Sequence, residues 1–236
     1  MGAPISTPDA VRTDGGQARR RRVRELVVDA NDGIIAVAGI GEGFLGAGAS
    51  RNTAMLAVVS ATIAGSIALG GSKYAEAANE RDAQQELIDE EQRQLALSPA
   101  AELAELTSYY VGRGISPDLA AQVAAELSGT NPLAAQLDAK HGIDVREPSV
   151  TPWLVALTAG VAFATGAALI VLTVAFSAPE WRTQAVLVAA GASLLATSIV
   201  AGRWGKVPIW RTALRTVVIG LIALLLSLAI GSMFEL

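Results

Sequence analysis

The sequence predicts an all-α membrane protein with five transmembrane helices and a cytoplasmic helical insert between the second and the third. Hydrophobic residues make up 52% of the 236 residues, charged residues make up 17%, and the mean hydropathy is +0.43. A soluble domain carries about 25% charged residues, so this composition favours a membrane protein. Five stretches also approach the roughly 20 apolar residues that a helix needs to cross a bilayer, and an acidic segment separates the second from the third.

Residues 1–24 are predicted to form a disordered, basic N-terminal tail. Residues 1–18 are rich in Gly, Pro, Ser, Thr and Asp, and five arginines follow: Arg19, Arg20, Arg21, Arg22 and Arg24. The run lacks the apolar segment and the cleavage site of a secretory signal. We therefore expect it to hold the start of the first span at the cytoplasmic surface, where it is suited to contact anionic lipid.

The predicted spans form two groups, transmembrane helices 1 and 2 within residues 25–72 and helices 3 to 5 within residues 148–236. Their apolar stretches are residues 31–50, 53–72, 152–176, 183–201 and 209–233. The first is the least hydrophobic, because it contains Glu42 and the glycines Gly39, Gly41, Gly43, Gly46 and Gly48. Glycines at that density allow another helix to approach closely, so we expect this span to pack inside the bundle.

The distribution of Lys and Arg predicts the orientation, because these residues are retained on the cytoplasmic side. With the N-terminus inside, only Arg51 and Arg182 face outside. Ten basic residues near span ends then face the cytoplasm: Arg12, the five arginines of the tail, Arg203, Lys206, Arg211 and Arg215. The same topology places residues 73–147 in the cytoplasm. No organelle-targeting signal is visible, and we expect a bacterial plasma membrane.

Residues 73–147 are predicted to form an acidic helical domain that binds metal. They hold nine Glu and five Asp against six basic residues, a net charge of −8. Residues 73–97 contain no Gly or Pro and are expected to continue the second span as a helix. Three further helices follow, each opened by a proline after Ser or Asn and two of them closed by glycine: Pro99, Gly112, Pro117, Pro132 and Gly142.

Three carboxylates share one face at the entry of the first span. Glu25, Asp29 and Asp32 are spaced i, i+4 and i+7, which places them within about 40° of one another on a helix. Like charges so placed repel, so they are either solvated at the membrane surface or bridged by a cation. Glu42 lies deeper in the span and about 80° away around the helix. It is interpreted either as a second coordination or proton-carrying site or as a contact with a neighbouring helix.

A second set of carboxylates lies on the acidic segment. Glu102 and Glu105 pair on one predicted helix, and six others have helical spacing on the preceding one: Glu76, Glu80, Asp82, Glu86, Asp89 and Glu90. Carboxylate oxygens suit Fe²⁺ and Mn²⁺, and helical bundles assemble such sites from facing helices. The residues alone leave two interpretations open, a metal site and a solvated helix face.

The chain has no cysteine and one histidine, His141. This composition excludes disulfides, thiolate zinc sites and iron–sulfur clusters, so a metal would be held mainly by oxygen. His141 precedes a helix-ending glycine and is expected to be a cap or surface residue. No nucleophile and base pair is visible in the spans, so we expect no enzyme.

The segment from Arg24 to Gly33, with Glu25 and Asp32, resembles the opening of the vacuolar iron transporter family. That family's first span carries an acidic residue after Arg and an Asn/Ser-Asp-Gly motif seven residues later. The resemblance covers nearly the whole chain after Arg24 and continues through residues 64–70, 99–114 and 202–220. The five predicted spans and the acidic insert agree with the family.

The resemblance implies a homodimer whose first spans line a path between subunits, and which exports Fe²⁺ or Mn²⁺ from the cytosol in exchange for protons. It implies that Asp32 contacts the metal within the membrane and that Glu25 precedes it. Family members hold a cytoplasmic metal site on two glutamate pairs, which align with Glu102 and Glu105 and with Glu91 and Gln94. The candidate metal ligands are Glu25, Asp29, Asp32, Glu42, Glu90, Glu91, Glu102 and Glu105.

Two family motifs are altered. Residues 66–71 lack the methionine and the glutamate that the second span of the family carries. Further along, Gln136, Leu137 and Lys140 stand where the family has two methionines and a glutamate. The loss of thioether ligands favours a hard, oxygen-loving ion, Mn²⁺ or Mg²⁺, over Fe²⁺.

The sequence supports two functions. The first is a transporter that exports a divalent metal ion, with Fe²⁺ or Mn²⁺ as cargo and no permanently bound cofactor. Its expected partners are the ion, the lipid bilayer and a second copy of the chain, and not nucleic acid. The second is a non-transporting membrane metal sensor or buffer that binds metal on residues 73–147.

Overall fold

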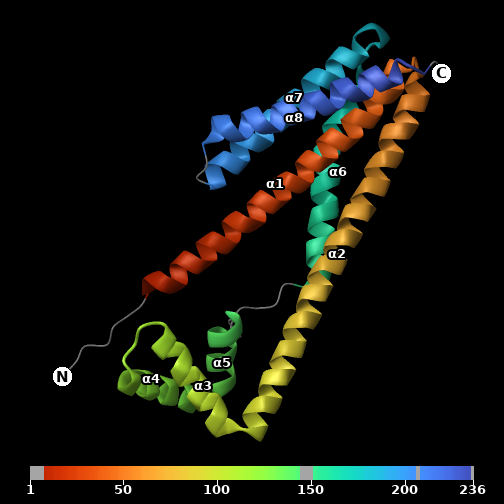
Figure 1. Ribbon diagram of the computed structural model, residues 1–236. Helices are drawn as coiled ribbons and strands as arrows, with labels where there is room; N and C mark the ends of the chain where they lie inside the picture. The colour runs from red at the N-terminus through yellow and green to blue at the C-terminus, as the bar shows by residue number, and fades with distance from the viewer. Residues whose placement is uncertain (1–7, 144–150, 206–207, 235–236) are drawn as a thin grey trace. The chain divides into compact units, whose positions relative to one another are not determined.

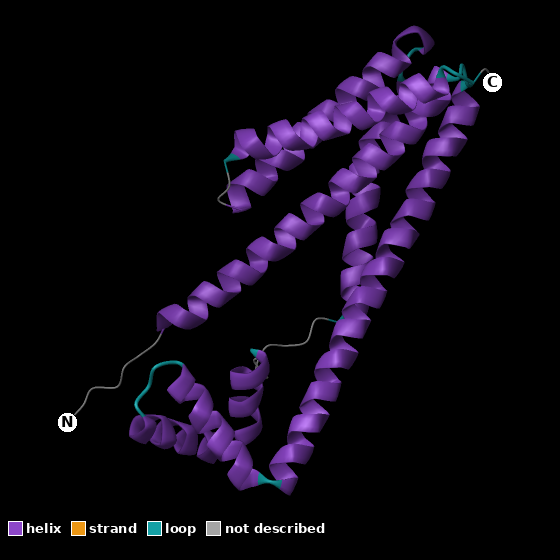
Figure 2. Ribbon diagram, in the orientation of Figure 1, coloured by secondary structure: helices purple, strands orange, loops and turns teal. Residues whose placement is uncertain are grey.

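The computed structural model describes residues 8–143, 151–205 and 208–234, and within them all regular structure is helical (Figures 1 and 2). The elements are α1 (Pro8–Gly46), α2 (Arg51–Leu97), α3 (Pro99–Gly112), α4 (Pro117–Thr130), α5 (Pro132–His141), α6 (Pro152–Phe176), the 3₁₀ turn η1 (Pro179–Trp181), α7 (Arg182–Gly205) and α8 (Ile209–Gly231). The all-helical prediction is confirmed for the described residues.

The chain divides into two compact units. The first, here called the bundle, consists of Met1–Tyr74 and Trp153–Leu236, and the second, here called the insert, is Ala75–Pro152. The predicted domain 73–147 overlaps this second unit, residues 144–147 lie outside the described residues, and its role as a cytoplasmic metal-binding domain stays a prediction. Helix α2 contributes its first part to the bundle and its second part to the insert.

The start of α1 differs from the prediction for the N-terminal tail. Residues 1–7 lie outside the described residues, but residues 8–24 are helical and continuous with the rest of α1, where we predicted disorder. Proline is tolerated in a first turn, and the Gln, Ala and Arg residues of 17–24 are good helix formers, so the helix held further along α1 can extend back through this segment despite the glycines before it. The Arg19 guanidinium also lies 4.5 Å from the ring centroid of Trp204 on α7.

Among the described residues, four helices are long and apolar enough to cross a membrane: Arg51–Leu97, Pro152–Phe176, Pro179–Trp204 and Ile209–Gly231. Helix α1 is not among them, because Asp32, Glu42 and several glycines lower its hydropathy. It nevertheless packs against α7 and α8, two of the four candidate spans. A multi-pass membrane protein follows from these helices, while the count of five spans stays a prediction.

The bundle core joins the five long helices. Its fully buried side chains come from all of them: Ile34, Val37 and Ala38 on α1, Ala54 and Val58 on α2, Ala167, Ile170 and Val174 on α6, Val186, Ala190 and Leu194 on α7, and Leu224 on α8. Polar contacts add to this packing, since Thr197 donates a hydrogen bond to the Asn31 side chain at 2.5 Å. This hydrogen bond connects α1 and α7 at the residue before Asp32.

Glycines bring the α1 backbone against its neighbours, as predicted. A Cβ atom at Gly231 of α8 would overlap the Gly43 carbonyl, and one at Gly46 would lie 2.6 Å from the Leu228 carbonyl oxygen. Between these contacts, the Ser227 hydroxyl donates to the Gly39 carbonyl at 2.6 Å. The buried side of α1 is therefore held at backbone distance from α8.

The insert follows the predicted breaks closely. Helices α3, α4 and α5 all begin at a proline, and the Asn131 side chain caps α5 by accepting a hydrogen bond from the Ala134 N–H at 3.1 Å. Gly142 ends α5 with φ of +64°, a conformation that favours glycine. The pairs α3·α4, α4·α5 and α3·α5 are in contact, so the three helices pack together.

Candidate cation sites

The three carboxylates at the entry of α1 differ in burial. Glu25 is exposed and forms an ion pair with Arg21, which is also exposed; the Arg21 Nε and Glu25 Oε1 atoms are 2.9 Å apart. Asp29 is 6% exposed and interacts with a neighbouring group, whereas Asp32 is exposed. The shared face predicted from their spacing therefore straddles the border between the core and the surface of the single chain.

Asp32 belongs to an open stripe along α1. Val28, Asp32, Ala36 and Ile40 follow one another at intervals of four residues, so they stack on one helix face, and all four are exposed in the single chain. The charge of Lys73, on α2, acts on the Asp32 carboxylate. A carboxylate in this part of a membrane helix is expected to face a partner or a water-filled path rather than lipid.

Glu42 lies on the buried side of α1, about 80° around the helix from Asp32. It is 0% exposed, and neither of its carboxylate oxygens has a hydrogen-bond partner among the described residues. Ala38 and Ile34, one and two turns earlier on the same helix, are fully buried members of the apolar core. An isolated buried carboxylate ion costs several kcal/mol, so this group must hold a proton or meet a cation.

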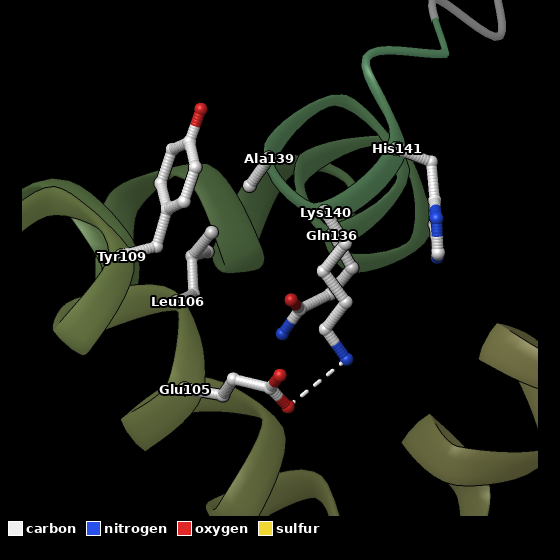
Figure 3. A pocket seen from close by; sticks show the side chains of 7 residues that line it. All are labelled: Glu105, Leu106, Tyr109, Gln136, Ala139, Lys140 and His141. Atoms are coloured by element: carbon white, nitrogen blue, oxygen red, sulfur yellow. Dashed lines mark ion pairs between the residues drawn. The ribbon is translucent and has the colours of Figure 1, made fainter.

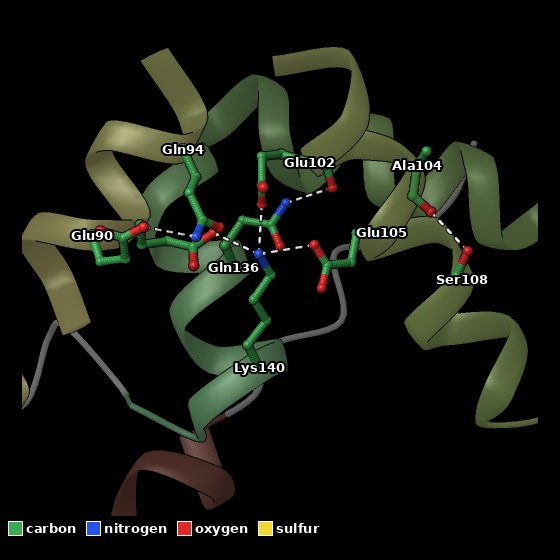
Figure 4. Close-up of polar contacts among 9 residues, drawn as sticks. Glu90, Gln94, Glu102, Ala104, Glu105, Ser108, Gln136 and Lys140 are labelled. Atoms are coloured by element: carbon green, nitrogen blue, oxygen red, sulfur yellow. Dashed lines mark hydrogen bonds and ion pairs between the residues drawn. The ribbon is translucent and has the colours of Figure 1, made fainter. Parts of the chain in front are cut away.

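In the insert, Glu91, Glu102 and Glu105 converge on one ammonium group. Figure 4 shows Glu102 and Glu105 beside Lys140. The Lys140 Nζ atom lies 3.0 Å from Glu91 Oε1, 2.6 Å from Glu102 Oε2 and 3.1 Å from Glu105 Oε2. The Lys140 side chain is 17% exposed, and those of Glu91 and Glu102 are 3% and 8% exposed. Three helices, α2, α3 and α5, thus meet at one cation that the chain itself supplies.

The electrostatics of this group reflect its burial. Burial raises the pKa of Glu91, and a hydrogen bond with Glu102 raises it further, while the hydrogen bond from Lys140 opposes both. For Lys140, burial acts to lower the pKa, but the hydrogen bonds to Glu102, Glu91 and Glu105 outweigh it and hold the pKa above its ordinary value.

A fifth polar side chain, Gln136, reaches the same place from α5. Its amide Nε2 donates to the Glu102 carbonyl at 2.6 Å, and its Oε1 is buried without a hydrogen-bond partner among the described residues. Gln136, Glu105, Lys140 and His141 help to line an open pocket of about 460 Å³ beside the ion pairs (Figure 3). His141 is exposed at the last residue of α5, as expected of a surface histidine.

The other carboxylates of α2 resemble a solvated helix face. Glu90 pairs with Arg93 and accepts from Gln94 Nε2 at 3.0 Å, and Gln85 donates to Asp89 at 2.8 Å. Gln94, which aligns with a family glutamate, is therefore directed to Glu90. The remaining acidic residues of this helix are exposed: Glu76, Glu80, Asp82 and Glu86.

Within the described ranges, no three His, Asp or Glu side chains are arranged to hold a metal ion. Asp32 is exposed and Glu42 is buried, about 80° apart around α1, and the Glu91, Glu102 and Glu105 group already surrounds an ammonium. The metal-ligand assignments from the sequence are not tested by this geometry and stay predictions. Sequence reasoning missed Lys140 and Gln136 as members of the group, although their i, i+4 spacing places both on one face of α5.

Comparison with known proteins agrees with the resemblance seen in the sequence. A vacuolar iron transporter of Acanthamoeba castellanii (strain ATCC 30010 / Neff) is 26% identical over 215 residues, which cover 90% of this chain and 78% of that protein. The model of the VIT family matches residues 23–232, from the entry of α1 to the end of α8. Since that match takes in most of the sequence together with its apolar helices, the chain belongs to the VIT family.

Proposed function

We propose that this protein exports a divalent metal ion, Fe²⁺ or Mn²⁺, from the cytosol in exchange for protons. Membership of the VIT family and the iron transporter relative support metal transport. In this proposal α1 also crosses the membrane and brings the number of spans to five. The chain works as a homodimer in a bacterial plasma membrane, with the N-terminus and the insert facing the cytoplasm. The proximity of Arg19 to Trp204 supports that orientation, because it places the arginine run at the same end of the bundle as Arg203.

The observation that carries the proposal is the exposure of Asp32 on the open stripe of α1. A carboxylate facing lipid is strongly unfavourable, whereas one that faces a second α1 across a dimer axis can bind an ion in a polar path. Glu25 then gathers ions at the cytoplasmic mouth, and Asp32 binds them within the membrane. Both ligands are hard oxygen donors, which suits Mn²⁺ or Fe²⁺ and favours Mn²⁺ where thioethers are absent.

Proton exchange is assigned to carboxyl groups of the same helix. A carboxylate that takes up a proton ceases to be a metal ligand, so a proton arriving from outside releases the metal. Glu42 is suited to carry that proton, because it is buried without a hydrogen-bond partner among the described residues and lies ten residues beyond Asp32. Asp29, which is buried at the edge of the acidic face, is kept as a secondary ligand.

The test is transport by the purified protein in liposomes that contain a dye quenched by Mn²⁺ or Fe²⁺. We expect quenching that is faster when an imposed pH gradient drives protons in the direction opposite to the metal. Liposomes without protein give the background. Absence of quenching above that background, with correctly folded protein, contradicts metal transport, and quenching that ignores the pH gradient contradicts proton exchange.

The alternative function, a metal sensor or buffer, requires the insert to bind metal. The ion pairs between Lys140 and Glu91, Glu102 and Glu105 compete with such binding. The proposal therefore places the transported ion on α1, and it assigns no metal to Glu90, which pairs with Arg93.

A further inference from the structure

One group of side chains in the insert resembles a cation site in which the cation is a lysine of the chain itself. Its members are Lys140, Glu91, Glu102, Glu105 and Gln136. Three carboxylates from two helices approach one ammonium within 3.1 Å, and two of them are almost fully buried. Surface ion pairs are mobile and contribute little. Burial of this kind instead demands a cation at every moment, because an unpaired buried carboxylate ion is strongly disfavoured.

The Gln136 side chain extends the same argument. Its Oε1 atom is buried and has no hydrogen-bond partner among the described residues, while its Nε2 atom is held by the Glu102 carbonyl. Figure 4 shows this side chain beside the Lys140 ammonium and the glutamates. The group therefore offers a fourth oxygen donor next to the three carboxylates, and carboxylate and amide oxygens are the donors that hard divalent cations prefer.

We propose that the Lys140 ammonium is the resident cation of the insert, standing among Glu91, Glu102, Glu105 and Gln136 where a divalent ion would otherwise bind. The insert then folds and stays folded without metal, and its carboxylates are closed to the transported ion. Removing the ammonium while keeping the four oxygen donors opens a site for Mn²⁺. This inference concerns the insert alone and does not depend on whether the protein transports metal.

A free metal ion does not readily displace the Lys140 side chain of the wild-type protein. Lys140 is tethered to α5, two residues before the cap Gly142, so its ammonium is present at a fixed high local concentration. A metal ion would have to expel this group from a position in which it is 17% exposed and makes three ion pairs. Each of those pairs would be lost together when the metal entered.

The experiment counts Mn²⁺ bound to the purified, full-length protein by the electron paramagnetic resonance signal of free Mn²⁺. We expect Lys140→Gln to bind one more Mn²⁺ than the wild type. Its melting temperature should rise by about 5 °C or more at a Mn²⁺ concentration 100 times the dissociation constant. The matched control is Arg93→Gln, which removes a basic partner from Glu90 in the same unit and should leave the Mn²⁺ count unchanged.

The wild-type background supplies a second measurement that needs no Lys140 variant. Glu102→Gln and Glu105→Gln in the wild-type chain should each leave the number of bound Mn²⁺ ions unchanged, since Lys140 excludes metal there. A folded Lys140→Gln protein that gains no Mn²⁺, or a wild-type protein that loses one on Glu102→Gln, overturns the inference. If Lys140→Gln does not fold, the wild-type comparison alone supports or overturns it. Neither readout involves transport, so failure of the proposed export function gives a different result.

Discussion

The bundle and the insert both bury carboxyl groups, but they neutralise them in different ways. In the bundle, Glu42 is fully buried and has no hydrogen-bond partner within the described part of the chain. In the insert, the buried Glu91 and Glu102 hold the ammonium of Lys140 between them. Burial is almost equal in the two places, and the difference lies in where the positive charge comes from.

This difference separates a structural charge from an available one. A carboxylate whose cation is part of the chain is satisfied at all times, and exchanging that cation disrupts the fold around it. A carboxyl group without such a partner must take a proton or an ion from solution. Glu42 and the exposed Asp32 are therefore suited to exchange, whereas Glu91 and Glu102 are suited to hold α2, α3 and α5 together.

The largest expected effect tests the available side of the comparison. Asp32→Ala removes the carboxylate from the open stripe of α1, and we expect metal uptake into liposomes to fall to the background of empty vesicles. It should also abolish the metal tolerance that the protein confers on a sensitive host. Asp118→Ala is the control, since Asp118 is an exposed carboxylate on α4 and belongs to neither site. Normal tolerance with Asp32→Ala would refute the proposed path.

Glu42→Gln tests whether the unpartnered carboxyl carries protons. The amide has the size of the acid but cannot release a proton, so we expect metal uptake that is no longer accelerated by a pH gradient. Ser227→Ala is the control, because Ser227 packs on the same stretch of α1 and has no titratable group. A Glu42→Gln protein that still responds to the gradient as the wild type does would assign the proton to another residue.

Lys140→Met tests the structural side. The variant keeps most of the side-chain volume but leaves two buried carboxylates without their cation, which costs about 3–5 kcal/mol for a buried pair. We expect faster amide hydrogen exchange in α3 and α5 without metal, while exchange in α7 and α8 is unchanged. Lys140→Arg, which keeps a positive charge, should show a smaller change. Equal protection in wild type and Lys140→Met would mean that the ion pairs contribute little.

Alkaline titration sharpens the same comparison. Because the pKa of Lys140 is raised in the folded insert by its glutamate partners, despite the opposing effect of burial, its contribution is complete below the ordinary value of 10.5 and is lost as the pH rises through the folded pKa. Glu91 has the opposite pH dependence. Because its pKa is raised in the folded insert, its contribution to stability increases as the pH falls towards the ordinary value of 4.5. Hydrogen exchange in α5 against pH should show an alkaline loss that Lys140→Gln lacks.

The smallest expected effect concerns the entry of α1. Arg21→Ala breaks the ion pair with Glu25, in which both side chains are more than half exposed. Exposed pairs of this kind contribute about 0.5 kcal/mol or less, so the melting temperature should stay within error of the wild type. A large loss of stability would place Glu25 with the structural carboxylates rather than with the available ones.

Much of the helical architecture was predictable from local signals. Prolines after Ser98, Ser116 and Asn131 and the glycine after His141 mark helix ends in the structure as they do in the sequence. The helical start of α1 was not predictable in the same way, because the composition of residues 8–18 favours disorder. Their helical conformation continues a helix that is held further along by packing against α7 and α8.

The candidate sites were predictable only as residue types and spacings. The positions of Glu25, Asp29 and Asp32 follow from helical periodicity, but the periodicity does not indicate which of them is buried. Lys140 was recognised as a departure from the family pattern, yet its role depends on α5 lying beside α2 and α3. Nothing local to residues 132–141 specifies that the ammonium lies between Glu91 and Glu102.

Composition and local spacing were enough to predict the helical class, the apolar segments and the positions of the helix breaks, and they predict that any metal site is rich in oxygen donors. These properties depend on composition and on contacts between residues close in the chain. The packing of the helices places Glu42 in the core without a hydrogen-bond partner among the described residues and brings Lys140 into ion pairs with three glutamates. The physical reason is that burial and charge pairing arise between helices distant in sequence, where one side chain decides whether a carboxylate needs an ion from solution.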